Sequence, residues 1–562
     1  MPRFIDIDTA LSSAASADAC ASIGAQRVFN VAGYGAVGDG VTGDWAAITA
    51  AITAAKAAGG GVVYLPTGTY LVNVALTVDG DNVTIQGAGR SATIIKTVSN
   101  QPVISVSAAT GVTVRDLQVL GDADALKTSQ RGVQFVNVTD GLVHNVWAKN
   151  LGYDGILLLT DNINCTVSNC RVSGCQDDSI NIGGDAGGTG TTGTVVVGNV
   201  ISDGLHTGIH ISDKSTHTTV TGNTISGCDT GIDTYTSNVA WRDQYNTITG
   251  NTIAGCTTNG IHIFASFENT VSANTIEGGA YGVRIEGGER CIVTGNIIKD
   301  TTSYGFRVES AADVAISSNL FLGATAGVRL ESPRVQFTGN IMRSVTTPVF
   351  LTTAADYSVI SDNVITGATG HNIEIQAQDC VINGNNLSDG NYSIYGSNAT
   401  RAVVSGNRVV GSARGIVAAG ADMLVIGNVL SAQTAIGIYL SSQPRCQVVG
   451  NRIMDNTGVA INAFNGDDAY IADNYTTNTT GNSLTADAGS TGMILAHNRF
   501  DSTVAAAASD EVQITLTPTT TYTVSNVSTD RTYDANSTST DELADVLGTL
   551  IADLKTRGII AS

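Results

Sequence analysis

Residues 198–202 read Gly-Asn-Val-Ile-Ser, and the phrase returns as Gly-Asn-Thr-Ile-Ser at 222–226 and as Gly-Asn-Thr-Ile-Ala at 250–254. A small or polar residue, an Asn, any residue and an apolar residue recur in this order every 21 to 28 residues. A period of this length predicts a solenoid, because one coil cannot bury its apolar face alone and must stack on its neighbours. The recurring Asn is found at Asn199, Asn223, Asn251, Asn274, Asn296, Asn319, Asn340, Asn363, Asn385, Asn407, Asn428, Asn451, Asn474 and Asn498.

Each period also holds a glycine followed by an apolar, a variable and an apolar residue, as in Gly-Ile-His-Ile at 208–211 and again at 260–263. Alternation of apolar and polar residues over four positions predicts a half-buried strand. Two or three such strands in one period leave no room for a helix, and Val, Ile and Thr stand where a leucine-rich repeat would show leucines. We therefore expect an all-β fold, a right-handed parallel β-helix of roughly 19 coils stacked at the interstrand spacing.

The recurring Asn has a structural interpretation that requires no chemistry. At one corner of every coil its amide would bond the Asn of the coils above and below, as amide ladders do in stacked sheets. The cysteines follow the same repeat, since Cys175, Cys228 and Cys256 share one register and Cys170 stands where the ladder Asn would be. The nine cysteines form no Cys-x-x-Cys motif, and no His cluster has zinc spacing, so we expect buried free thiols and no metal site.

Composition restricts the class of protein. Charged residues make up 14% of the 562 residues, and the net charge of −21 argues against nucleic acid as a partner. The start of the chain lacks the basic and apolar regions of a signal peptide, and no run of 18 apolar residues could cross a membrane. We expect a protein made without a signal peptide, with no membrane partner and no cofactor.

The front of a β-helix exposes strand edges and core, and must be covered. Residues 44–58 show an amphipathic helix pattern that ends at a run of three glycines. We expect this helix to cover the front of the stack through an apolar face made of Trp45, Ile48, Ile52 and Ala55.

The segments on either side of this helix resemble a known family. Residues 28–40 (VFNVAGYGAVGDG) and 61–70 (GVVYLPTGTY) are similar to the entry segment of pectate-lyase-like β-helix proteins, which include phage tailspikes and many polysaccharide-degrading enzymes. The resemblance implies the fold and leaves the reaction open, because the fold carries hydrolases, lyases, epimerases and pure binders.

The period stops after Asn498. Residues 511–527 alternate as short strands, and Ser-Thr-Asp-Glu at 539–542 is a capping box that opens a helix with an apolar face. The segment resembles C-terminal parts of phage tail proteins, which implies a virion component and a homotrimer; the alternative is a helix that plugs the end of a monomer. We divide the chain into a lead segment at 1–27, a front cap at 28–60, the β-helix at 61–502 and a strand segment with a terminal helix at 503–562.

The variable residue of the strand phrase points away from the core, so successive coils stack it into a column. Most solvent faces of a solenoid collect Thr, Ser and Asn, whereas this column and the one two residues on collect titratable and aromatic groups. The first column reads Leu157, Asn181, His210, Asp233, His262, Arg284, Arg307 and Arg329, and the second reads Ser212, Tyr235, Phe264, Glu286, Glu309 and Glu331.

The lower part of these columns allows two interpretations. Arg and Glu two residues apart on stacked strands can pair diagonally and cancel the like-charge repulsion within each column. Alternatively, the guanidinium groups bind hydroxyls or carboxylates of a sugar. The candidates for substrate binding on this face are Tyr235, His262, Phe264, Arg284, Glu286 and Arg307.

The upper part carries the candidate chemistry. An Asp-Gly-Ile phrase at Asp154, a Gln-Asp-Asp phrase ending in Asp177 and Asp178, and a coil with His206 and His210 resemble the active-site strands of polygalacturonase-type hydrolases. The resemblance implies Asp178 as general acid, Asp154 and Asp177 as holders of the attacking water, and either His as their support. The family's Gly-His-Gly reads Gly-Leu-His here, and its Arg-Ile-Lys becomes Arg-Ile-Glu several coils away.

Coil spacing points to the same chemistry. Carboxylates on adjacent coils lie roughly 5 Å apart and those two coils apart about 10 Å, which brackets the separations that retaining and inverting glycosidases need. Crowding raises the pKa of one carboxyl, which supplies the acid. Asp233, between His210 and His262, is a competing catalytic candidate. The alternative is structural, because adjacent Asp residues at a coil corner often accept backbone N–H bonds.

Two functions of different classes follow. The first is a tailspike-like protein of a phage virion that binds and hydrolyses a bacterial surface polysaccharide, and the second is a non-catalytic glycan-binding or structural tail fibre. A lyase or epimerase of the same fold, with His262 or Tyr235 as base and the Arg column neutralising a uronate, is a further enzymatic variant. The sequence names neither the sugar nor its linkage, and it leaves open a site shared between subunits.

Overall fold

The computed structural model describes residues 27–184, 190–236, 243–442, 444–487 and 489–505, together with the strand β59 (Glu511–Gln513). The described chain is an all-β, right-handed parallel β-solenoid of about 19 turns with little helix, which confirms the predicted fold. It divides into two compact units, Met1–Ala377 and Gln378–Ser562, which are described separately.

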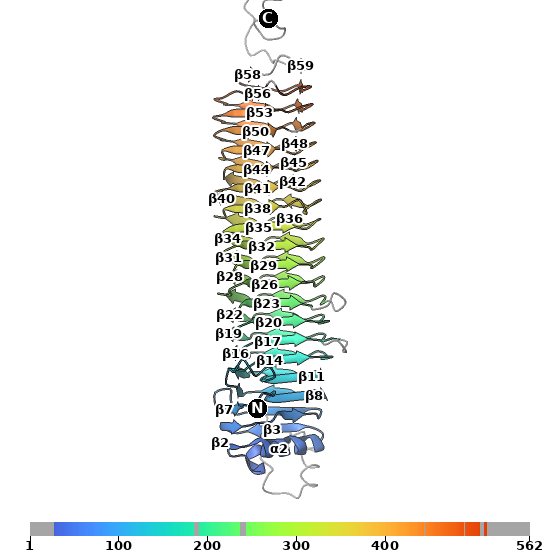
Figure 1. Cartoon of the computed structure of the whole chain (residues 1–562), viewed down its shortest axis with the longest axis vertical. Helices are drawn as coiled ribbons and strands as arrows, with labels where there is room; N and C mark the ends of the chain where they lie inside the picture. The colour runs from blue at the N-terminus through green and yellow to red at the C-terminus, as the bar shows by residue number, and fades with distance from the viewer. Residues whose placement is uncertain are drawn as a thin grey trace, which may run out of the picture. The chain divides into compact units, whose positions relative to one another are not determined.

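Each coil crosses three parallel sheets in turn, which we call A, B and C. In one coil of the first unit, β18 (Val195–Val197) lies in sheet A, β19 (Val200–Ser202) in sheet B and β20 (Thr207–Ser212) in sheet C. In the first unit, strands pair in parallel with their counterparts in the neighbouring coil, so that Val196 lies beside Val220. This register stacks equivalent positions of the sequence repeat directly on one another (Figure 1).

Sheet C carries the candidate site. In the first unit it contains β5 (Leu76–Val78), β8 (Ile104–Thr110), β11 (Val133–Thr139), β14 (Ile156–Leu159), β17 (Ile180–Gly183), β20, β23 (Thr230–Tyr235), β26 (Asn259–Phe264), β29 (Tyr281–Glu286), β32 (Tyr304–Glu309), β35 (Ala326–Glu331), β38 (Thr347–Leu351) and β41 (His371–Ile375). In the second unit it contains β44 (Tyr392–Gly396), β47 (Arg414–Ala418), β50 (Ile436–Ser441), β53 (Val459–Phe464), β56 (Leu484–Ala486) and β58 (Val504–Ala505).

The recurring Asn forms the predicted ladder. The Oδ1 atom of Asn223 accepts hydrogen bonds from the backbone N–H and from the Nδ2 group of Asn199, both at 2.9 Å, and Asn223 donates to Asn251 in the same way. Cys170 stands one coil before Asn199, and its N–H donates to the Oδ1 atom of Asn199 at 2.8 Å. These amides are buried and satisfied, so their role is structural.

Two glycine positions show why glycine recurs in the sequence repeat. Gly198, directly before a ladder Asn, has a φ of 65°, a left-handed conformation that glycine adopts without a steric penalty. Gly208 is the second residue of β20 in sheet C, and a Cβ there would lie 2.6 Å from the carbonyl oxygen of Gly231 in the next coil. The first glycine therefore turns the chain at a corner, and the second lets adjacent coils approach.

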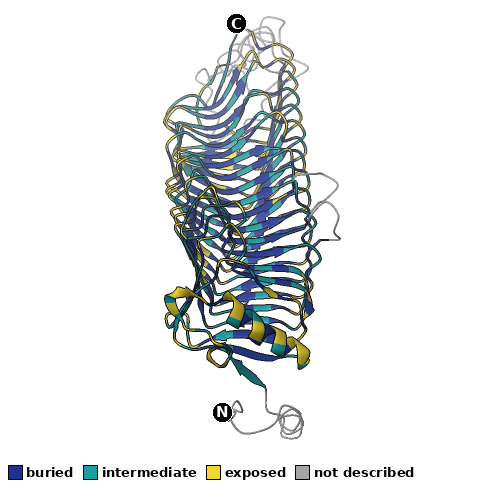
Figure 2. Ribbon diagram, turned by 60° about the horizontal axis from the view of Figure 1, so that its bottom comes forward, coloured by how far each residue is buried: buried dark blue, intermediate teal, exposed yellow. Residues whose placement is uncertain are grey.

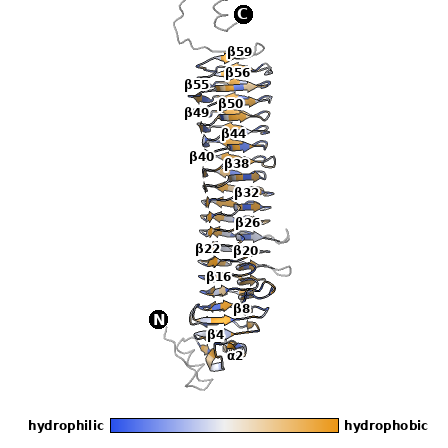
Figure 3. Cartoon of the chain, turned by 60° about the vertical axis from the view of Figure 1, so that its left-hand side comes forward, coloured by the Kyte–Doolittle hydropathy of each residue, from blue (hydrophilic) through white to orange (hydrophobic). Residues whose placement is uncertain are grey.

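The apolar residues of each strand face the interior of the coil. Ile209 and Ile211 on β20 have no exposed surface, while His210 between them points outward. Buried residues run along the strands as dark-blue stripes in Figure 2, and Figure 3 shows hydrophobic residues concentrated in the strands, with polar residues at the corners. Stacking of these interior stripes supplies the hydrophobic core.

The front of the first unit is covered by η1 (Val31–Tyr34) and the helix α2 (Trp45–Ala57), close to the predicted 44–58. Ile48, Ile52 and Ala55 are buried as expected, and the opposite face of α2 is exposed (Figure 2). Trp45 departs from the prediction, because it is partly exposed and its indole N–H donates to the carbonyl of Ala75 at 3.1 Å. The helix packs against β1 (Val28–Asn30), β3 (Gly61–Leu65) and β5.

All the cysteines of the described residues are free and buried, as predicted. Burial raises the pKa of Cys175 to about 12, so its thiol does not ionise near neutral pH. Among the described residues, no helix has the length and apolarity required to span a bilayer.

Several predictions concern residues outside the described part of the chain. The lead segment, the strands expected at 514–527 and the terminal helix belong to this group. The predicted domain limits at 27, 60 and 502 and the predicted homotrimer also stay predictions.

Candidate active site

The register of sheet C places the two predicted columns side by side. Asn181 lies beside His210, His210 beside Asp233, and Asp233 beside His262. The column continues through Arg284 and its partners on β32 and β35, while Glu286, Glu309 and Glu331 align two residues further along the strands. The strand phrase thus predicted which residues neighbour one another on this face.

Three carboxylates and an imidazole meet where β14, β17 and β20 begin. Asp154 precedes β14, Asp177 and Asp178 precede β17, and His206 precedes β20. The Nδ1 atom of His206 lies 2.8 Å from Asp178 and 3.5 Å from Asp177. We call these four residues the carboxylate cluster. His210 does not belong to it, because its imidazole pairs with Asp233.

Asp178 is held by three donors. Its Oδ1 atom accepts from Nδ1 of His206 at 2.8 Å and from the backbone N–H of Thr207 at 3.2 Å, and its Oδ2 atom accepts from Nδ2 of Asn181 at 3.2 Å. The hydrogen bond to Asp178 is the main cause that raises the pKa of His206 above its usual value, with further help from the charges of both neighbouring carboxylates. With 57% of its side chain exposed, His206 can touch a substrate.

Asp154 sits behind the cluster and is 1% exposed. Its Oδ2 atom accepts from Nε of Arg131 at 3.1 Å, whereas its Oδ1 atom has no partner among the described residues. Burial and the nearby charges of Asp178 and Asp177 raise the pKa of Asp154 to about 7, although Arg131 opposes them. Near neutral pH the cluster therefore holds a proton on Asp154 for part of the time.

Asp177 is the most accessible carboxylate of the cluster, with 26% of its side chain exposed. Tyr153 lies beside it, and burial together with a hydrogen bond to Asp177 raises the pKa of Tyr153 to about 12. The ring of Tyr153 lies under the guanidinium of Arg131, at 4.9 Å from its centroid. The exposed surface of the cluster thus consists of Asp177 and His206.

Three residues of the carboxylate cluster could also act as ligands of a metal cation. One ligand atom each from Asp177, Asp178 and His206 lies within 4.8 Å of the others. A metal bound there would displace the hydrogen bond between His206 and Asp178. The absence of a metal and of a cofactor stays a prediction.

His210, Asp233 and His262 form a second polar group, which lies one to three coils beyond the coil of Asp177 and Asp178. The Oδ1 atom of Asp233 is 3.1 Å from Nδ1 of His262, and its Oδ2 atom is 3.6 Å from Nδ1 of His210. Burial opposes ionisation of Asp233, yet the two imidazoles outweigh it and lower its pKa to about 2. Burial likewise opposes the charging of His210, but Asp233 and the more distant Asp178 raise its pKa to about 9. All three side chains are largely buried, so the group is a closed array of one carboxylate and two imidazoles.

Tyr235 and Phe264 lie next to this array and face solvent. Their rings stack at 4.9 Å with an interplanar angle of 18°, and Tyr235 is 40% exposed. His210 and His262 flank them, with ring centroids 6.3 Å from Tyr235 and 5.8 Å from Phe264. The pair forms a flat apolar surface on an otherwise polar face.

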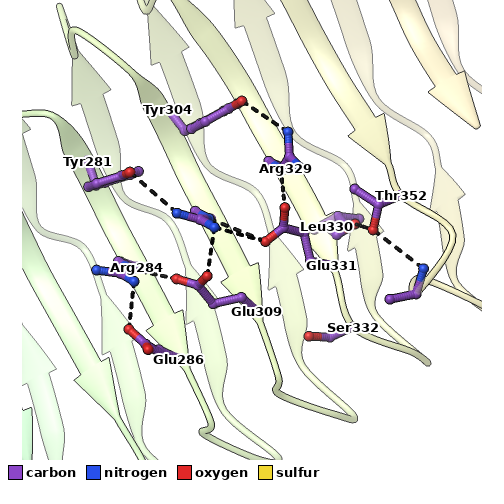
Figure 4. A network of polar contacts seen from close by, with 12 residues as sticks. Tyr281, Arg284, Glu286, Tyr304, Glu309, Arg329, Leu330, Glu331, Ser332 and Thr352 are labelled. Carbon is purple, nitrogen blue, oxygen red and sulfur yellow. Dashed lines mark hydrogen bonds and ion pairs between the residues drawn. The ribbon is translucent and has the colours of Figure 1, made fainter.

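The lower part of the columns is a ladder of ion pairs, as the structural interpretation predicts (Figure 4). Arg284 contacts Glu286 at 2.7 Å and Glu309 at 2.6 Å, and Arg307 contacts Glu309 at 2.7 Å and Glu331 at 3.1 Å. The last members of the ladder pair in the same way, since Arg329 donates to Glu331, and it also bonds the hydroxyl of Tyr304 at 3.4 Å. Each guanidinium is thereby engaged by a carboxylate.

Sequence reasoning missed three residues near these groups. Arg131 is the ion-pair partner of Asp154, and Tyr153, which directly precedes the Asp-Gly-Ile phrase, is bonded to Asp177. Asp243 is buried at the corner after β23, where its Oδ1 atom accepts from the N–H of Ser215 at 2.8 Å. Burial raises the pKa of Asp243 well above its usual value. No repeat phrase contains Arg131 or Asp243, so the pattern carried no signal for them.

Comparison with known families gives three matches along the chain. Residues 28–262 match the family described as rhamnogalacturonase A/epimerase, pectate lyase-like. Residues 244–395 match the periplasmic copper-binding protein (NosD) family, and residues 349–500 match the right-handed β-helix region family. The first match contains the whole carboxylate cluster.

Individual proteins show shorter or weaker similarity. Mannuronan C5-epimerase AlgE6 of Azotobacter vinelandii is 53% identical over 77 residues, which cover 12% of this chain and only 9% of that protein. The solved A-module of the same epimerase is 20% identical over 81% of this chain and 99% of that chain, with a TM-score of 0.34. The solved Dettilon tailspike protein is 15% identical over 68% of this chain and 66% of that chain, with a TM-score of 0.41.

Proposed function

Because the chain is a pectate-lyase-like β-helix protein, we propose that it is a glycoside hydrolase that binds and cleaves a polysaccharide of the bacterial surface, as the spike of a phage tail. The observation that carries the proposal is the carboxylate cluster. Three successive coils bring three carboxylates and an imidazole together, and their environments differ. Glycosidases need such a set, in which one group donates a proton while another stays ionised.

The geometry favours particular roles within the cluster. His206 is exposed and its pKa is raised, so it donates the proton to the leaving-group oxygen. Asp177 is the accessible carboxylate. It lies 3.5 Å from Nδ1 of His206, much closer than the about 6.5–9.5 Å of a pair that admits a water, so it stabilises the positive charge of the transition state. Asp178 holds the imidazole of His206 and is a positioning residue, whereas the family resemblance gives Asp178 the acid role. This difference rests on the three donors that Asp178 already accepts.

Asp154 acts on the others through charge. Since it takes up a proton near neutral pH, it varies the negative charge that surrounds Asp177 and Asp178. Activity should therefore depend on pH around neutrality.

A lyase or epimerase acting on a uronate is the second candidate. The 77-residue similarity to a mannuronan C5-epimerase favours it. Such a reaction needs a base for a carbon-bound proton and a cation on the uronate carboxylate. Tyr153 could serve as the base, but its neighbours Asp177 and Asp178 are carboxylates that would repel the substrate's own.

The test is incubation of the full chain with purified bacterial capsular polysaccharides, following reducing ends and the ultraviolet absorbance of unsaturated products. Hydrolysis yields reducing ends without that absorbance, a lyase yields both, and a non-catalytic fibre yields neither. Asp177→Asn should abolish release of reducing ends. Asp229→Asn is the matched control, because Asp229 lies at the equivalent corner before β23 and its Oδ1 atom accepts from the hydroxyl groups of Thr257 and Thr258.

A further inference from the structure

Every Arg and His side chain on the outer face of sheet C from β14 to β35 contacts a carboxylate, within the described residues. His210 and His262 contact Asp233, and the three arginines of the ladder contact Glu286, Glu309 and Glu331. At the edge of this face, His206 contacts Asp178 and Arg131 contacts Asp154. Among these side chains each guanidinium contacts a carboxylate, and the exposed imidazole of His206 is bordered by Asp177 and Asp178.

A uronate would have to displace one of these carboxylates. Glu309 contacts Arg284 at 2.6 Å and Arg307 at 2.7 Å, and these two arginines lie on adjacent coils. A uronate that displaced the Glu309 carboxylate would therefore break its contacts with both arginines. The displaced glutamate would stay next to the incoming carboxylate, and like charges so close together are unfavourable. The ladder therefore rejects carboxylates along this face.

The long-range electrostatic field of the protein also disfavours binding of an anionic glycan. The chain carries a net charge of −21, and Asp177 is the exposed carboxylate of the cluster. A polyanionic glycan would approach against this field, and its rate of association would be lowered. A neutral glycan meets no such barrier.

An aromatic surface lies on the same face. Tyr235 and Phe264 stand two and three coils beyond the coil of Asp177, which is about 10 to 15 Å along the stack at the interstrand spacing. Their stacked rings present an apolar plane, and His210, Asp233 and His262 beside them are largely buried. Flat aromatic planes bind the apolar faces of sugar rings and need no charge on the sugar.

We infer that the glycan bound by this face is neutral over the sugars that contact β14 to β35, and that one of these sugars stacks on Tyr235 and Phe264. The chain of sugars runs along the stack of coils from the carboxylate cluster to the aromatic pair. The inference rests on the proposed function and narrows its substrate to glycans without uronates at these positions.

The test uses the full-length chain in affinity electrophoresis through gels containing purified bacterial capsule and O-antigen polysaccharides, half with neutral and half with uronate-containing repeats. A neutral polysaccharide should retard the protein equally at low and high salt, because no ion pair forms. Tyr235→Leu, which keeps an apolar side chain without the ring, should weaken binding about two- to tenfold, as expected for loss of an aromatic contact. Tyr245→Leu is the matched control, since Tyr245 is also half exposed and stacks on His217 at 5.3 Å, but at the corner before β24 (Thr247–Thr249).

Preferential, salt-sensitive retardation by uronate polysaccharides would overturn the inference and leave hydrolysis intact. Retardation by a neutral polysaccharide that is never cleaved would refute hydrolysis and leave the inference intact. Unchanged binding by Tyr235→Leu would remove the aromatic subsite. Retardation by no polysaccharide of either kind would overturn both proposals.

Discussion

The Nδ1 atom of His206 lies 2.8 Å from the Oδ1 atom of Asp178, although 28 residues separate them in the chain. The hydrogen bond joins one coil to the next at the corner where sheet C begins. It ties the protonation of an exposed imidazole to a buried carboxylate, and the proposed chemistry depends on this pair.

Asp178→Asn should lower the pKa of His206, because the main cause of its raised value is removed. A proton donor is active below its pKa, so the alkaline limb of the pH–rate profile should move to lower pH. His206→Gln should lower kcat by roughly 10²–10⁴-fold, the usual contribution of a general acid. Glycan binding by both variants should persist in affinity electrophoresis. An unchanged alkaline limb in Asp178→Asn would show that His206 is not the donor.

Asp233→Asn should leave most of the hydrolysis intact, because Asp233 belongs to the buried array with His210 and His262. The substitution should instead change how the stability of the folded protein depends on pH. The pKa of His210 is raised to about 9 in the folded state, so its contribution is complete below its usual value of 6.5 and is lost as pH rises through 9. Thermal unfolding should show this alkaline decline in the parent chain and not in Asp233→Asn. Loss of hydrolysis in Asp233→Asn with Asp178→Asn still active would place the chemistry further along the column.

Asp243→Asn should stabilise the protein at neutral pH. The folded state raises the pKa of Asp243, so it favours the protonated form, and ionisation above the unfolded value of 3.8 weakens folding. An amide keeps the acceptor for the N–H of Ser215 and removes the buried charge. We expect a gain of about 1–3 kcal/mol in the free energy of unfolding near neutrality, the usual cost of an unsatisfied buried polar group. The gain should vanish below pH 3.8, and a gain that persists there would contradict the charge explanation.

Asn251→Ala should destabilise the solenoid by about 1–3 kcal/mol, because the N–H and Nδ2 groups of Asn223 lose their shared acceptor in a buried position. Thr252→Ala is the matched control, since Thr252 is the next residue and is exposed. Urea unfolding of both variants gives the measurement. Equal midpoints would mean that the Asn ladder adds no stability.

Removal of residues 537–562 should convert a homotrimer into monomers. The prediction rests on the apolar stripe of the terminal helix in the sequence, which copies of the chain would bury against one another. Light scattering of the full-length and shortened chains measures the change. A full-length chain that already has the mass of a monomer, 57.5 kDa, would refute the trimer and weaken the proposal of a tail spike.

The sequence alone determined the solenoid, its Asn ladder and the neighbours along sheet C. Parallel coils stack equivalent positions, so a repeat read in one dimension predicts contacts in three, as for His210, Asp233 and His262. The repeat could not predict which charged side chains form ion pairs and which remain accessible to a ligand. Pairing of Arg284 with Glu309, the contact of Arg131 with Asp154, and the burial of Asp243 depend on side-chain rotamers and corner geometry, which follow no repeat. Those features decide the protonation of the cluster and the charge of the glycan, because pKa values and ion pairing depend on burial and on distances of a few ångströms.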